Sequence, residues 1–156
     1  MRVELIVESN ACLEVPEAAW QHIAYVKGQR EDVGDADIQL SLPMLSEKLL
    51  RTLVSLLAQH AHDQPVPDNW AQLPSRELTE ADVDAFKLLS GMELISLANA
   101  ASMMGCQLLL NCVAKWLAQE LYDKEMPAIQ DYFGVHMELT DEHRAHLRNV
   151  YPAAFD

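Results

Sequence analysis

The chain has few basic residues, and this shortage limits the partners it can have. Lysine and arginine together number 11, against 24 aspartates and glutamates, so the formal net charge is −13 at pH 7. A nucleic-acid site needs lysine and arginine clustered opposite the phosphates, and here the basic residues are scattered along the sequence. We therefore expect no nucleic-acid partner.

Long apolar runs and an N-terminal leader are also missing. No apolar run reaches the roughly 18 residues that a membrane-spanning helix needs. The first residues alternate between polar and apolar types, without the apolar core of a secretory signal. Three cysteines, an odd number, are typical of a reducing compartment. We therefore expect a soluble protein of the cytoplasm or nucleus, with no membrane partner.

Motifs for catalysis and cofactor binding are absent as well. The five glycines never cluster, so there is no phosphate-binding loop, and no Gly-x-Ser-x-Gly elbow exists. Cys12, Cys106 and Cys112 fall in segments expected to be buried, whereas a reactive thiolate needs a polar, partly open site. His143 and His146 could share a helix face, but they lack the ligand pattern of structural zinc sites. The expectation is a protein that is not an enzyme, with no catalytic residue, metal or cofactor.

The first part of the chain has the pattern of a small sheet with helices. Alternating apolar and polar residues predict three strands, over residues 3–7, 12–15 and 38–42. Pro16 can open a helix that carries Trp20, and the charged stretch 28–37 is expected to be a loop. Ser46 is a predicted N-cap for a helix through His60.

Helical spacing dominates the rest of the chain. Residues from about 62 to 78 contain three prolines and are expected to be a mobile loop. Thr79 and Asp82 predict a capping box for a helix that continues to Met92. Two further helices have predicted buried faces of Leu94, Leu97, Ala98, Ala101 and Met104, and of Leu110, Val113, Ala114, Leu117 and Leu121. Pro127 then suits the first turn of another helix, and Thr140 the cap of a last one.

This order of features resembles the Skp family, the adaptors that join F-box proteins to cullins in SCF ubiquitin ligases. The resemblance is carried by the stretch from about Phe86 to Arg148. The residues in matching register are Leu94, Ala100, Ala101, Leu109, Leu110, Lys115, Ala118, Lys124, Ile129, Phe133 and Thr140. The chain departs from the family pattern at Ser102, Met103, Asp123, Gln130, Glu138 and Leu139. The first two of these replace the family's Asn-Tyr pair.

The resemblance implies both a fold and a function. The fold is α/β, with a BTB/POZ-like small mixed sheet packed with helices over residues 1–122 and a C-terminal helical extension over 123–156. The function is that of a non-catalytic adaptor between an F-box substrate receptor and a cullin. The implied F-box-binding residues are Cys106, Leu110, Val113, Ile129, Phe133, Val135, Leu139, Leu147 and Tyr151. The implied cullin-binding residues are Ser102 and Met103, where loss of Asn and Tyr predicts weakened binding or a divergent cullin.

Two other functions stay open on the sequence. One is a BTB-type scaffold or oligomerisation module, used as elongin C is used or in an F-box complex without a cullin. The long C-terminal extension favours the Skp type over this alternative. The other is a small enzyme, which the lack of catalytic motifs places last.

Overall fold

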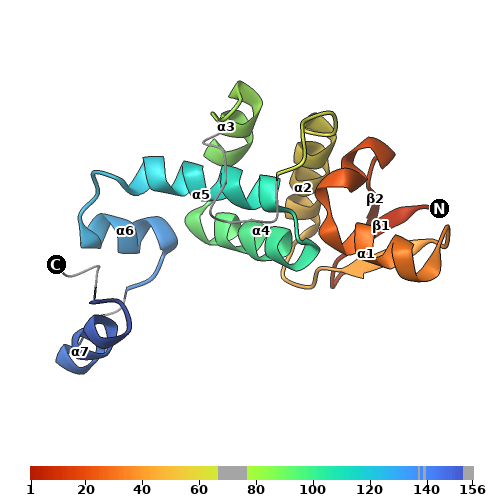
Figure 1. Cartoon of the computed structure of the whole chain (residues 1–156). Helices are drawn as coiled ribbons and strands as arrows, with labels where there is room; N and C mark the ends of the chain where they lie inside the picture. The colour runs from red at the N-terminus through yellow and green to blue at the C-terminus, as the bar shows by residue number, and fades with distance from the viewer. Residues whose placement is uncertain (67–76, 137, 139, 153–156) are drawn as a thin grey trace. The chain divides into compact units, whose positions relative to one another are not determined.

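The computed structural model describes residues 1–66, 77–136, 138 and 140–152 (Figure 1). The chain divides into two compact units, Met1–Asp123 and Lys124–Asp156, each of which is described by itself. The predicted mobile loop falls largely on residues 67–76, which lie outside the described residues. Among the described residues, no helix is both long enough and apolar enough to span a membrane.

The first unit contains a small mixed sheet. Its strands are β1 (Val3–Ile6), β2 (Cys12–Glu14) and β3 (Ile38–Ser41), in the order β2-β1-β3. β1 is antiparallel to β2 and parallel to β3, which places Leu5 opposite both Leu13 and Leu40. The predicted α/β class, a small mixed sheet packed with helices, is confirmed.

The connection from β2 to β3 differs from the prediction. Residues Glu17–His22 form a 3-10 helix, η1, and α1 (Ala24–Val33) follows after an extended residue at Ile23. The predicted loop over 28–37 is therefore helical in its first half. Charged side chains of α1 face solvent, and the helix stops only at Gly34, which has a positive φ of 69°.

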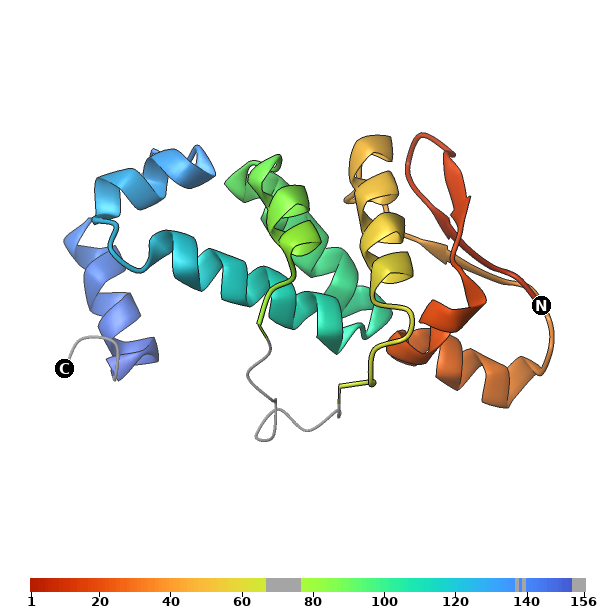
Figure 2. The ribbon, with the colours of Figure 1, turned by 90° about the horizontal axis from the view of Figure 1, so that it is seen from above.

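Helix α2 (Glu47–Gln59) begins at its predicted cap, because the Ser46 hydroxyl accepts a hydrogen bond from the Leu49 N–H at 3.2 Å. Figures 1 and 2 show α2 between the sheet and α4 (Gly91–Met104). The buried residues of α2 are Leu49, Leu50, Leu53, Leu56 and Leu57. This helix therefore joins the sheet layer to the helical layer.

The helix predicted to run from Thr79 through Met92 is two helices. α3 (Glu80–Lys87) ends at Leu88, and α4 begins after Ser90 with a capping box of its own. The Ser90 hydroxyl accepts from the Glu93 N–H at 3.2 Å, and the Glu93 carboxylate accepts from the Ser90 N–H at 2.8 Å. The capping box of α4 ends α3, because its two hydrogen bonds use the Ser90 and Glu93 N–H groups. In a continued helix these groups would have to donate to the carbonyl oxygens of the preceding turn.

Helix α5 (Gln107–Leu121) packs along α4 but turns a different face inward from the one predicted. Its buried residues are Leu108, Leu109, Cys112, Val113 and Trp116. Leu110, Leu117 and Leu121 are only half-buried, and Ala114 is exposed. Both faces have helical spacing, and the large Trp116 ring, 6.1 Å from the ring of Phe86, occupies the inner one.

The α4–α5 turn lies against the start of α1. Gly105 has φ +66° and ψ 34°, and a Cβ added there would lie 2.7 Å from the Cβ of Ala24. The Ala24 N–H also donates to the Gly105 carbonyl at 3.4 Å. Glycine is required here both for the left-handed backbone and for the close approach.

Gly105→Ala should therefore lower the free energy of unfolding by about 2 kcal/mol or more, from left-handed strain together with overpacking. Urea denaturation of the single and double variants measures this. Adding Ala24→Gly removes the atom that the new Cβ meets, so the double variant should lose less stability than the two single losses added together. Strict additivity of the two losses would show that the contact with Ala24 contributes nothing.

Candidate protein-interaction site

The second unit consists of two short helices that bury none of their residues. These are α6 (Met126–Phe133), with Pro127 in its first turn as predicted, and α7 (Asp141–Val150). The Thr140 hydroxyl caps α7 by accepting from the His143 N–H at 3.2 Å, as predicted. α6 ends at Gly134, which has φ 64°. The local signals in the sequence thus define both helices, but no residue described within either helix is buried.

The apolar side chains of this unit remain open to solvent to different extents. The Tyr132 and Phe133 rings meet edge to face, with centroids 5.2 Å apart, and both are half-buried. Of the predicted F-box-binding residues, Ile129, Phe133 and Leu147 are half-buried, while Val135 and Tyr151 are 40% and 61% exposed. Leu139 lies outside the described residues. Apolar groups left open in this way are available to a partner.

The first unit presents only some of its predicted contact residues. Cys106 and Val113 are fully buried in its core, so these two are corrected to packing residues and are excluded from any surface. Leu110 is half-buried. Ser102 and Met103, the predicted cullin contacts, lie exposed in the last turn of α4.

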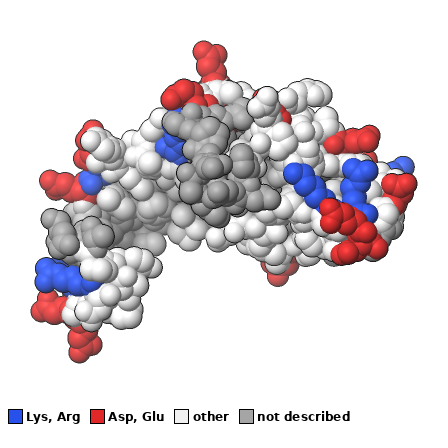
Figure 3. Space-filling view, in the orientation of Figure 1, with Lys and Arg blue, Asp and Glu red and all other residues white. Residues whose placement is uncertain are grey.

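Basic residues form no patch of their own on the face drawn in Figure 3. Lys and Arg side chains there lie beside Asp and Glu side chains. On this face, the mixture of charges leaves no concentrated positive field for a polyanion. Independently of this view, Lys48 pairs with Glu93 at 3.0 Å and Arg51 pairs with Glu47 at 2.6 Å.

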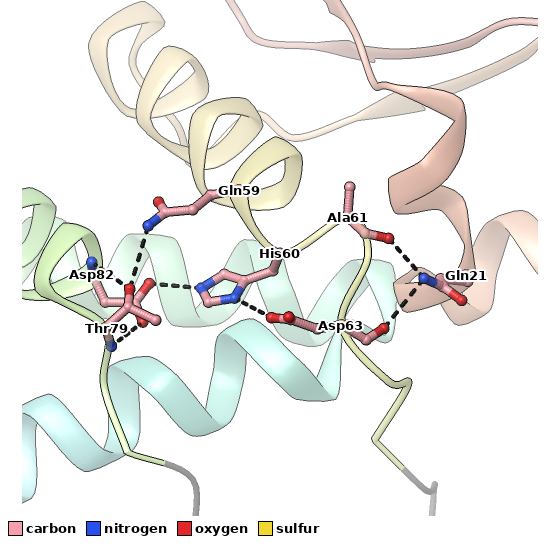
Figure 4. Close-up of polar contacts among 7 residues, drawn as sticks. All are labelled: Gln21, Gln59, His60, Ala61, Asp63, Thr79 and Asp82. Carbon is pink, nitrogen blue, oxygen red and sulfur yellow. Dashed lines mark hydrogen bonds and ion pairs between the residues drawn. The ribbon is translucent and has the colours of Figure 1, made fainter.

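A buried polar cluster was missed by the sequence reasoning. His60 follows α2 directly, and its ring lies between two carboxylates (Figure 4). Its Nδ1 is 2.6 Å from an Asp63 oxygen, and its Nε2 is 2.7 Å from an Asp82 oxygen. His60 is 1% exposed and Asp82 is fully buried. The histidine at the end of the helix predicted from Ser46 is therefore the centre of a buried polar network.

Asp82 has two roles in this network. One carboxylate oxygen lies 2.7 Å from Nε2 of His60. The other accepts a hydrogen bond from the Thr79 N–H at 2.9 Å, which completes the predicted capping box of α3. Burial acts to raise the pKa of Asp82. Hydrogen bonds from His60 and from the Thr79 N–H outweigh this effect and hold the pKa below its usual value. Asp82 is therefore an ionised, fully paired group.

Neighbouring amides extend the network to other elements. The Gln21 side chain, at the end of η1, donates to the carbonyl oxygens of Ala61 and Asp63 at 2.7 and 3.3 Å. The Gln59 amide donates to the Thr79 hydroxyl at 3.3 Å (Figure 4). The cluster thus joins η1, the end of α2 and the start of α3. The capping box and the short spacing of His60 and Asp63 were visible in the sequence, but the contact across 22 residues was not.

The cysteines lie in different environments, and one expectation was wrong. Cys12 was expected to be buried, but it is exposed, because it lies opposite Ile6 on the less buried face of the sheet. Cys106 and Cys112 are buried as expected. Burial raises the pKa of the Cys106 thiol to about 11, which keeps it protonated and unreactive at neutral pH.

Removing the histidine of the cluster should destabilise the first unit strongly. His60→Ala leaves the Asp82 carboxylate buried without its counter-charge, and we expect a loss of about 3–5 kcal/mol in the free energy of unfolding. Arg51→Ala is the control, since it breaks an ion pair of the same length in which both side chains are more than half exposed. That variant should lose less than about 1 kcal/mol. Equal losses in urea denaturation would mean that burial of the His60 pair does not matter.

No family model matches this chain, and no curated protein matches it significantly.

Proposed function

We propose that this chain is a non-catalytic adaptor of the Skp type, which links an F-box protein to a cullin. The observation that carries the proposal is the second unit, whose two helices bury none of their residues and leave aromatic and aliphatic side chains open. Helices of 8 and 10 residues are too short to be stable alone in water. An apolar partner helix packed against them would supply the missing burial.

The first unit supports a BTB/POZ-like body in this proposal. Two antiparallel strands, a helical segment and a third strand parallel to the first follow one another along the chain, and α2 packs next to the sheet. This is the element order that the Skp resemblance implies. In the proposal, the body contacts the cullin and the second unit contacts the F-box.

The proposed F-box surface is restricted to the second unit. It consists of Ile129, Phe133, Val135, Leu147 and Tyr151, all of them at least partly exposed. Cys106 and Val113 are left out because no partner can reach them. Aromatic and aliphatic anchors of this kind supply most of the binding free energy in helix-in-groove complexes.

The proposed cullin contact is the exposed pair Ser102 and Met103. In the Skp family these positions carry Asn and Tyr, which offer an amide and a rigid ring with a hydroxyl. Serine is shorter than asparagine, and methionine offers flexible apolar area without a directed hydrogen bond. Accordingly, we expect weaker cullin binding than an ordinary Skp adaptor has, or a cullin with matching changes.

A charge on the proposed F-box surface should weaken binding. Val135→Asp places a carboxylate where an apolar partner would pack, and we expect at least a tenfold loss of affinity for a panel of purified F-box domains in fluorescence titration. Leu88→Asp is the matched control, because Leu88 is an apolar side chain of the first unit that is 78% exposed. It should leave the affinity unchanged. Failure of the wild-type chain to bind any F-box domain would overturn the adaptor proposal, and a dimer found by sedimentation would then favour a scaffold module.

Restoring the family's pair should strengthen cullin binding. The combined change Ser102→Asn and Met103→Tyr adds back an interfacial hydrogen bond worth roughly 1–3 kcal/mol, or about tenfold or more in affinity. Titration against the N-terminal domain of a standard cullin measures this. Because both positions are exposed, folding is expected to be unaffected, which circular dichroism checks. An unchanged affinity in the double variant would place the cullin contact elsewhere.

A further inference from the structure

Three potential metal ligands from three different helices meet in the core of the first unit. His60 lies at the end of α2, Asp82 in the first turn of α3, and Cys112 within α5. A ring nitrogen, a carboxylate oxygen and the sulfur all lie within 4.8 Å of one another, and all three residues are buried. Such residues are seldom buried together without a structural or chemical reason.

We propose that His60, Asp82 and Cys112 form a binding site for a divalent transition metal, with zinc as the best fit. An imidazole, a carboxylate and a thiolate are a donor set that zinc accepts, and a fourth position would remain for water. Magnesium and calcium prefer sites made only of oxygen ligands, so the sulfur and nitrogen donors disfavour them.

The surrounding hydrogen bonds orient the ligands as a metal site requires. Asp63 accepts from Nδ1 of His60 at 2.6 Å, and Nε2 then lies 2.7 Å from an Asp82 oxygen. A carboxylate on the far nitrogen of a ligating histidine is the usual supporting contact in zinc sites. The Thr79 N–H holds the second oxygen of Asp82 at 2.9 Å, so the first oxygen stays directed inwards.

Charge also balances when a metal replaces protons here. Both ring nitrogens of His60 lie within hydrogen-bond distance of carboxylate oxygens, which can only accept. Binding of one zinc ion would displace the Nε2 proton and the Cys112 thiol proton. Two positive charges enter and two protons leave, so the net buried charge is unchanged.

The geometry needs only a small adjustment. Ligand atoms of a tetrahedral zinc ion lie about 3.3–3.6 Å apart, given bonds of about 2.0–2.3 Å. The separation between Nε2 of His60 and the Asp82 oxygen, 2.7 Å, would widen as the metal replaces the shared proton. The longer separations, none above 4.8 Å, would shorten through side-chain rotation. Such a metal would join α2, α3 and α5, independently of the adaptor function.

Cobalt(II) titration of the purified full-length chain tests this site, because thiolate ligation to cobalt gives a charge-transfer absorption that histidine or carboxylate ligation does not. All variants carry Cys12→Ser, so that the exposed thiol cannot contribute. We expect one cobalt per chain with a charge-transfer band, and loss of the band in Cys112→Ser. Cys106→Ser is the matched control, since it alters the other buried thiol, and it should keep the band.

Two further measurements keep the proposal falsifiable if Cys112→Ser does not fold. Asp63→Asn should keep the band but lower cobalt affinity about 10–100-fold, because only the supporting hydrogen bond changes. Zinc, and not magnesium, should raise the melting temperature of the parent chain. Absence of the band in the parent at saturating cobalt, or its persistence in a folded Cys112→Ser variant, would show that the three residues form no metal site.

Discussion

The imidazole of His60, buried between the carboxylates of Asp63 and Asp82, determines how the parts of the first unit are joined. A carboxylate in a core is unfavourable unless it is hydrogen-bonded, and the His60 ring lies within hydrogen-bond distance of the fully buried Asp82 and of the partly exposed Asp63. Its position is fixed by the end of α2, while Asp82 is fixed by the capping box of α3. The two helices are therefore held to each other by the same groups that define where one ends and the other begins. The apolar contacts among the sheet, α2, α4 and α5 provide most of the burial, but apolar contacts are not directional. The hydrogen bonds of His60 are directional and therefore fix how α2 and α3 are oriented.

Much of the fold could be predicted from the sequence, because the signals involved are local. Caps at Ser46, Thr79 and Thr140 each formed the expected hydrogen bond, and alternation identified all three strands.

The errors in the predicted helices have physical reasons. α1 extends through Gly28 despite the weak helix propensity of glycine and ends only at Gly34, and Ser90 divides one predicted helix into two. On α5, two apolar faces have the same periodicity, and only the tertiary contact of Trp116 with Phe86 distinguishes them.

The candidate sites differ in how far the sequence could define them. The extents of α6 and α7 follow from local helix signals, whereas Val135 and Tyr151, which lie just beyond these helices and are exposed, were named only from the Skp resemblance. The ligand cluster could not be predicted in this way. His60 lies 22 residues before Asp82, and Cys112 lies a further 30 residues along, so their proximity depends on how α2, α3 and α5 pack. Sequence spacing identifies metal sites when the ligands share a turn or a helix, and it is uninformative when each ligand comes from a different helix.

The two units differ in how far their side chains are buried, and this contrast supports the adaptor proposal. In the first unit, a large apolar core is buried, and the polar side chains of Asp82 and His60 are buried and paired with each other. In the second unit, no residue of α6 or α7 is buried, although Tyr132, Phe133 and Leu147 could each contribute apolar area to a core. Two short helices gain little stability from helix propensity and capping alone. Burial of these apolar side chains would supply further stabilising free energy. A partner that covers both helices would therefore order them as it binds. Part of the interaction free energy would then be used for this ordering, so affinity should depend on how well α6 and α7 are already formed.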